Sequence, residues 1–152
     1  MTYKYTTLLL KNKETPMVEF LRTKGIDFNK LLKERKHSHF KLKSEGFMDL
    51  TVEVFPEGED MVLSVCHYYE QNGDLCRDPE ITYKLVNQTE ELVWEDATTI
   101  TQDPMGVFRE VYKTVDGKNF VNTNLKTELQ DFTQTWVKNL KFQGHELIKE
   151  VE

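Results

Sequence analysis

The side chains best suited to chemistry are concentrated in one segment, residues 67–80, which reads HYYEQNGDLCRDPE. It supplies the imidazole of His67 and the carboxylates of Asp74, Asp78 and Glu80. Carboxylates and imidazoles a few ångströms apart are the usual ligands of hydrolytic metal sites. These residues have no recognised ligand spacing, such as HExxH, a CxxC pair or a calcium loop. The sequence therefore predicts no metal site and no cofactor.

The two cysteines do not complete a nucleophilic site either. Cys66 is followed by His67, but neighbouring residues of a strand point to opposite faces, so they cannot form a thiolate–imidazole pair. Cys76 has one neighbouring cation, Arg77, which is too little to identify a reactive thiol. We therefore predict no catalytic residue, and a binding protein fits the sequence better than an enzyme.

The same segment is explained better as a binding surface or as a structural hairpin. A turn needs only Asn72, Gly73 and Asp74, yet aromatic and polar residues continue on both sides of it. We expect the segment to bind another macromolecule, most simply a protein. The candidate binding residues are Tyr68, Tyr69, Asn72, Asp74 and Asp78. The alternative is a self-contained hairpin whose Asn and Asp side chains bond to nearby backbone groups.

A two-residue period predicts the strands that hold this segment. From about residue 39 to residue 101, apolar residues alternate with polar ones, which is typical of half-buried antiparallel strands. Strands are expected over 48–54, 61–69, 81–85 and 91–101, and a short extended piece over 107–112.

The alternation also predicts which residues share a face of the sheet. We expect Val54 to pair with Met61, and Leu85 to lie beside Val65. This register gathers the apolar residues of three strands on one face, and a slip of one residue would invert every face. The opposite face then carries Asp49, Thr51, Glu53, Ser64, Cys66, Tyr68, Glu80, Thr82 and Lys84.

Helices are predicted on either side of the strands in the sequence. Thr15 followed by Pro16 is a typical helix start, and Asp27 can cap a second helix. A long helix is expected to begin at Asn122 or Thr123 and to end at Gly144. Its apolar stripe, which suits a helix that covers a sheet, consists of Leu125, Leu129, Phe132, Trp136 and Leu140.

These elements predict an α+β fold: an antiparallel meander of about four strands, with N-terminal helices and a long C-terminal amphipathic helix packed on one face. We expect one domain over residues 1–152. It would comprise a mainly helical, basic N-terminal part (1–38), the antiparallel sheet (39–101) and the C-terminal helix (122–144). Residues 1–10 are compatible with an edge strand or with a short lead-in.

Charge is distributed unevenly along the chain. Residues 1–43 hold 11 Lys/Arg and 4 Asp/Glu, a balance of +7, whereas residues 44–152 hold 9 and 22, a balance of −13. A basic arm of this kind can bind nucleic acid. The simpler explanation is that the basic part packs beside an acidic sheet and lowers the self-repulsion of the protein. Nucleic-acid binding is therefore kept as an alternative to protein binding.

The start of the chain, its apolar runs and its two cysteines predict the cellular compartment. The chain starts without the long apolar stretch of a secretory signal, and its longest aliphatic run, 8–10, cannot span a bilayer. Two cysteines without a signal indicate free thiols in a reducing compartment. We expect a cytoplasmic protein that does not associate with membranes, and we predict no oligomeric state.

The hairpin segment followed by residues 81–83 resembles the signature of a small bacterial family that is described only as a domain of unknown function. Residues 102–112 and 125–144 resemble the same family, so the resemblance covers roughly 40–145. Its members are found on plasmids, conjugative elements and phages. The resemblance implies neither an activity nor a cofactor, but it implies a mobile-element setting, where accessory and anti-defence proteins are common.

Three functional hypotheses follow. The first is a non-enzymatic macromolecule-binding module of a mobile element. The second is a metal-dependent hydrolase that uses the acids of segment 67–80 together with His67. The third is a nucleic-acid-binding protein that uses its basic N-terminal part.

Overall fold

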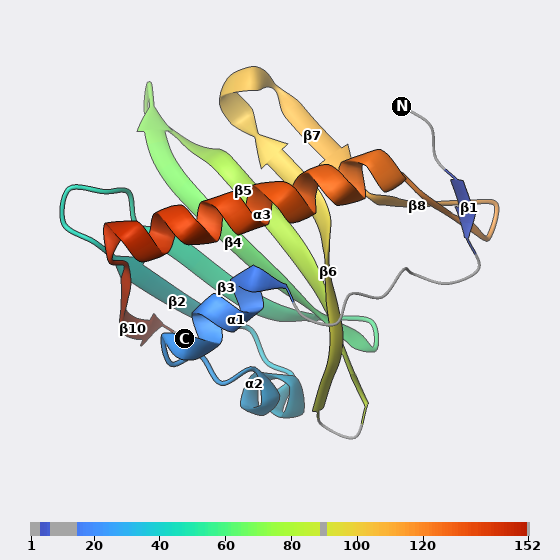
Figure 1. Cartoon of the computed structure of the whole chain (residues 1–152), viewed down its shortest axis with the longest axis horizontal. Helices are drawn as coiled ribbons and strands as arrows, with labels where there is room; N and C mark the ends of the chain where they lie inside the picture. Colours follow the sequence, from blue (N-terminus) through green and yellow to red (C-terminus); the bar gives the residue numbers. More distant parts are fainter. Residues whose placement is uncertain (1–3, 7–14, 89–90, 152) are drawn as a thin grey trace.

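The computed structural model describes residues 4–6, 15–88 and 91–151, and Figure 1 shows their arrangement. A strongly twisted antiparallel sheet forms one layer, and helices cross one of its faces. In chain order the elements are β1 (Lys4–Thr6), α1 (Pro16–Thr23), α2 (Phe28–Glu34), β2 (Ser38–Lys43), β3 (Leu50–Glu57), β4 (Asp60–Gln71), β5 (Asp74–Gln88), β6 (Glu91–Gln102), η1 (Asp103–Met105), β7 (Val107–Glu110), β8 (Tyr112–Val115), β9 (Lys118–Val121), α3 (Thr123–Gln143) and β10 (Glu146–Val151).

The α+β class and the C-terminal helix are confirmed, but the predicted strand number is wrong. The main sheet has seven strands in the order β10-β2-β3-β4-β5-β6-β7, and β1, β9 and β8 form a small second sheet. The four predicted strands are the central ones, β3 to β6. Strands β2, β7 and β10 flank them. Strand β7 lies within the extended piece predicted over 107–112, whereas β2 and β10, with six residues each, were not assigned as separate strands.

The predicted registers are wrong by even numbers of residues, so the predicted faces hold. Val54 pairs with Leu63 rather than with Met61, because the turn between Glu57 and Asp60 contains only two residues. Leu85 pairs with Met61 rather than lying beside Val65. Since side chains alternate with a period of two, shifts of two and four residues leave each residue on its own face.

The helical face of the sheet carries the core. Caps form where they were predicted: Thr15 accepts a hydrogen bond from the Val18 amide, Asp27 accepts one from the Lys30 amide, and Asn122 accepts one from the Leu125 amide. The buried core includes side chains of α1, α2, α3 and strands β2 to β6. Burying these apolar surfaces is the main stabilising contribution to the fold.

The predicted stripe of α3 needs one correction. Phe132 remains 36% exposed, whereas Thr133 is buried, so the helix presents Thr133 rather than Phe132 to the sheet. The Thr133 hydroxyl lies 2.9 Å from the hydroxyl of Tyr83, which is fully buried on β5. A buried tyrosine hydroxyl needs a hydrogen-bond partner, and this position of α3 supplies one.

Only part of residues 1–10, predicted as either an edge strand or a short lead-in, lies within the described residues. Residues 4–6 form β1, which pairs with β9 of the small sheet. The rest of the predicted stretch, residues 1–3 and 7–10, lies outside the described residues, as do residues 11–14 of the predicted basic part.

Candidate functional site

The segment singled out in the sequence forms the outer half of the β4–β5 hairpin, which extends past α3 in Figure 1. Its tip is a two-residue loop between Gln71 and Asp74. Asn72 and Gly73 both have positive φ, at 53° and 82°, the combination that Asn-Gly adopts in tight hairpin turns. The identity of Asn72 is therefore accounted for by the turn itself.

The five candidate binding residues do not gather at one point. Tyr68 pairs with Arg77, while Tyr69 pairs with Cys76 one step along the ladder and therefore points to the other face. Asp74 is exposed at the tip, roughly 10 Å along the strand from Arg77. Asp78 is half-buried and precedes Pro79 through a cis peptide bond. Their role in binding stays a prediction.

A bulge at the base of the hairpin determines which side chains meet. The ladder pairs Tyr68 with Arg77 and then Cys66 with Glu80, so two residues of β5 lie opposite His67 alone. Simple alternation would place Arg77 and Glu80, three positions apart, on opposite faces. The extra residue brings both to the same face, where Nη1 of Arg77 lies 3.6 Å from Oε1 of Glu80.

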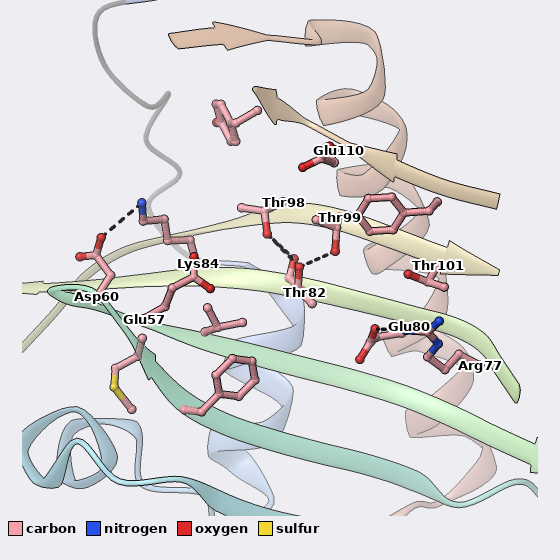
Figure 2. Close-up of a pocket in the computed structure, with 15 residues that line it drawn as sticks. Glu57, Asp60, Arg77, Glu80, Thr82, Lys84, Thr98, Thr99, Thr101 and Glu110 are labelled. Atoms are coloured by element: carbon pink, nitrogen blue, oxygen red, sulfur yellow. Dashed lines mark hydrogen bonds and ion pairs between the residues drawn. The ribbon is translucent and has the colours of Figure 1, made fainter. Parts of the chain in front are cut away.

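These two residues form one end of a cleft on the sheet face opposite the core. The cleft has a volume of about 390 Å³, and Figure 2 shows its floor on the central strands. Among the described residues, none that lines it belongs to a helix. The lining consists of Phe55, Glu57, Asp60, Met61, Val62, Arg77, Glu80, Thr82, Lys84, Thr98, Thr99, Thr101, Phe108, Glu110 and Tyr112.

A hydrogen-bonded network fixes the Arg77 end of the cleft. The Asp103 carboxylate accepts hydrogen bonds from the backbone amide of Arg77 (2.7 Å) and from its Nε (3.1 Å) and Nη2 (3.3 Å). These bonds hold the pKa of Asp103 below its ordinary value. Ser64 donates to Oε2 of Glu80 at 2.7 Å. The network links β4 and β5 to η1 and leaves the guanidinium between two carboxylates.

The floor and the far end of the cleft are also internally bonded. The hydroxyl of Thr82 contacts the hydroxyls of both Thr98 and Thr99, as the dashed lines in Figure 2 show. At the far end, Nζ of Lys84 lies 3.3 Å from Oδ2 of Asp60. The cleft therefore presents a row of hydroxyls between two ion-paired cations.

Cysteine chemistry is disfavoured by the position of Cys66. Its thiol is 1% exposed, and burial, with the Glu80 carboxylate adding to it, raises its pKa to about 12. At neutral pH it is therefore a protonated thiol. The neighbouring His67 lies on the other side of the strand, as predicted, and both of its ring nitrogens have hydrogen-bond partners.

The described residues offer little support for the other two hypotheses. Among them, no three His, Cys, Asp or Glu side chains group as ligands of a metal ion. The cations of the α2 region are engaged: Lys30 and Lys36 pair with Glu34, and Arg35 donates to the carbonyls of Gly58 and Glu59 in the β3–β4 turn. These three cations therefore have partners within the protein and do not form a row of unpaired cations for phosphates.

The sequence pattern missed most residues of the cleft. Thr98, Asp103 and Glu110 come from β6, η1 and β7, and only the pairing of distant strands places them beside Arg77. One local signal was present: a proline within a strand pattern, here Pro79, indicates a bulge or an edge.

Comparison with known proteins identifies the family but no activity. The model of the family described as "Domain of unknown function (DUF6908)" matches residues 24–146, and the chain belongs to this family. No curated protein and no solved structure matches the chain. Within the described part of the chain, no helix has the length and apolarity needed to cross a membrane.

Proposed function

We propose that this DUF6908 member is a non-enzymatic accessory protein that binds another protein through the Tyr68–Glu80 hairpin and the cleft at its base. The observation that carries the proposal is the cleft of about 390 Å³ on the non-core face, with one end built by Arg77 and Glu80 of that hairpin. Concave sites that combine apolar walls with a few fixed polar groups are the usual places of ligand binding.

The state of the polar groups supports binding rather than catalysis. A general acid or base, or an activated nucleophile, needs a pKa close to the working pH and access to a substrate. The cations of the cleft are instead ion-paired, Arg77 with Asp103 and Lys84 with Asp60, and the adjacent Cys66 thiol has a pKa of about 12. Such groups fix a surface in one shape, which favours recognition.

For the setting, we propose the cytoplasm of a bacterium that carries a mobile element. The resemblance of the hairpin segment to proteins of plasmids, conjugative elements and phages supports the mobile element. Cys66 and Cys76 are both unpaired, which fits a reducing compartment.

The test is a comparison of hairpin variants in partner capture. The tagged wild-type protein is used to capture partners from its native host. The captured partner is then purified, and its binding to the wild-type protein and to the variants is measured in vitro. In the Tyr68→Ala, Asp74→Ala double variant, partner binding should be abolished while the melting temperature moves by less than about 5 °C.

A matched control variant shows whether a loss of partner binding is specific to the hairpin residues. The Glu45→Ala, Asp131→Ala double variant alters exposed residues elsewhere and should bind the partner like wild type. Full retention of binding by the Tyr68→Ala, Asp74→Ala variant would exclude the hairpin as the recognition surface.

A further inference from the structure

The charge of the cleft restricts the kind of partner it can accept. Four carboxylates line it, against the two cations Arg77 and Lys84, an excess of two negative charges. Neither cation is available to an incoming anion, since Arg77 lies between Asp103 and Glu80, and Lys84 pairs with Asp60. A phosphate or a carboxylate entering the cleft would meet more like charge than opposite charge.

Carboxylates at the sides of the cleft and hydroxyls on its floor supply hydrogen-bond acceptors. Glu57 and Glu110 bring carboxylates to its sides, and neither side chain is buried. The hydroxyls of Thr82 and its neighbours bond to one another and keep lone pairs that can accept further hydrogen bonds. A donor-only group, such as an ammonium or a guanidinium, is complementary to this lining.

The walls of the cleft suit an apolar stem. Phe55, Phe108 and Tyr112 line it together with Val62, and Phe108 is 61% exposed. Lysine and arginine carry aliphatic stems that pack on apolar surface, and their cationic heads are attracted to aromatic rings. One side chain of this type would therefore use both the walls and the carboxylates.

We propose that the cleft binds a lysine or arginine side chain from an exposed basic segment of the partner protein. This inference rests on the proposed function and specifies the chemistry of the partner. The volume of about 390 Å³ admits one long side chain with its adjoining backbone, since pockets that enclose small ligands measure roughly 300–1,000 Å³. The neighbouring hairpin would contact the residues that flank this side chain.

The experiment uses the full chain and a fluorescent, end-blocked peptide of alternating lysine and serine, with fluorescence anisotropy at an ionic strength of about 0.15 M. The Glu57→Gln, Glu110→Gln variant should weaken peptide binding by about tenfold, because it removes two charges from the cleft. The control variant, Glu45→Gln, Asp131→Asn, loses the same charge at exposed positions that do not line the cleft, and its affinity should change by less than about twofold. A peptide with norleucine in place of lysine should not bind.

Three results would overturn the inference: no binding of the lysine peptide, full affinity in the cleft variant, or equal losses in both variants. Equal losses would mean that the peptide responds only to the overall charge of −6. Binding of the captured partner to the hairpin variant and to the cleft variant distinguishes a failure of this inference from a failure of the proposed function. If the partner requires Tyr68 and Asp74 but binds the cleft variant normally, the proposed function stands and the cationic site is rejected. If neither variant affects the partner, both are rejected.

Discussion

His67 is held as a neutral imidazole by one hydrogen bond at each ring nitrogen. Nδ1 lies 2.8 Å from the Asp49 carbonyl, which only accepts, so Nδ1 carries the proton. Nε2 accepts from the indole N–H of Trp136 at 3.1 Å. Protonation would place a second N–H against that donor. Burial lowers the pKa of His67, and nearby His145 acts in the same direction, while the Asp49 carbonyl and the Asp78 carboxylate oppose the shift.

This arrangement predicts that acid destabilises the protein. Because the pKa of His67 is lower in the folded than in the unfolded chain, the unfolded chain takes up the proton first as pH falls. The stabilisation by His67 is present above its ordinary pKa of 6.5 and is lost as pH falls from there through the folded pKa. An NMR titration of the imidazole between about pH 8 and pH 5 should give a midpoint below 6.5.

Trp136→Phe supplies the control for this titration. The variant keeps an aromatic ring but removes the N–H donor at Nε2, so the midpoint of His67 should rise. A midpoint at or above 6.5 in the wild-type protein would contradict the assigned protonation state.

A hydrogen bond between Thr133 and Tyr83 joins the helix α3 to the sheet, and neither residue belongs to the predicted apolar stripe of the helix. Thr133 and Tyr83 are 1% and 0% exposed, and their hydroxyls bond to each other across the interface between helix and sheet. Thr133→Val keeps the shape but leaves the tyrosine hydroxyl without its partner. The free energy of unfolding should fall by about 1–3 kcal/mol, measured by urea denaturation.

Two further variants test this explanation. Adding Tyr83→Phe to Thr133→Val should recover most of the loss, because removing both partners leaves no buried polar group unsatisfied. Phe132→Ala, one position away and 36% exposed, should cost less than about 1 kcal/mol. If Phe132→Ala costs more than Thr133→Val, the orientation of α3 described above is wrong.

The central strands and the helices were predictable because local signals dominate them. Alternation identified β3 to β6 and the faces of β3, β4 and β5, and the caps at Thr15, Asp27 and Asn122 were identified from residue type. Alternation cannot identify the pairing offset, since shifts of two and four residues preserve the faces. Strand β2, which lies between β10 and β3, was not assigned as a separate strand, because its six residues contain few repeats of the pattern.

The cleft was predictable only in part. Glu80, Thr82 and Lys84 were assigned to the non-core face, where they line the cleft. Arg77 joins them only through the bulge opposite His67, and bulges depend on how two strands pair rather than on either sequence alone. Residues of β6, η1 and β7 complete the site through contacts that are distant in sequence.

Across the whole molecule, the basic N-terminal part meets acidic partners within the fold. Nζ of Lys24 lies 2.7 Å from Oε1 of Glu146 of β10, and Nζ of Lys43 lies 3.8 Å from Oδ2 of Asp49. Exposed ion pairs of this kind contribute little stability individually. They do reduce the local excess of positive charge, which supports the interpretation that this part packs against an acidic sheet.

This distribution predicts that the protein does not bind nucleic acid. A polyanion approaching the +7 part is repelled by the −13 of the remaining chain, and this repulsion extends furthest at low ionic strength, where the screening length is greatest. Titration of labelled duplex DNA and single-stranded RNA with the full chain should give no binding at low ionic strength. Binding through the phosphate backbone would instead be strongest at low ionic strength. The logarithm of its association constant would fall by about 0.9 per phosphate contact for each tenfold rise in salt concentration. Such a dependence, removed by Lys30→Glu with Lys33→Glu, would establish the nucleic-acid hypothesis in place of protein binding.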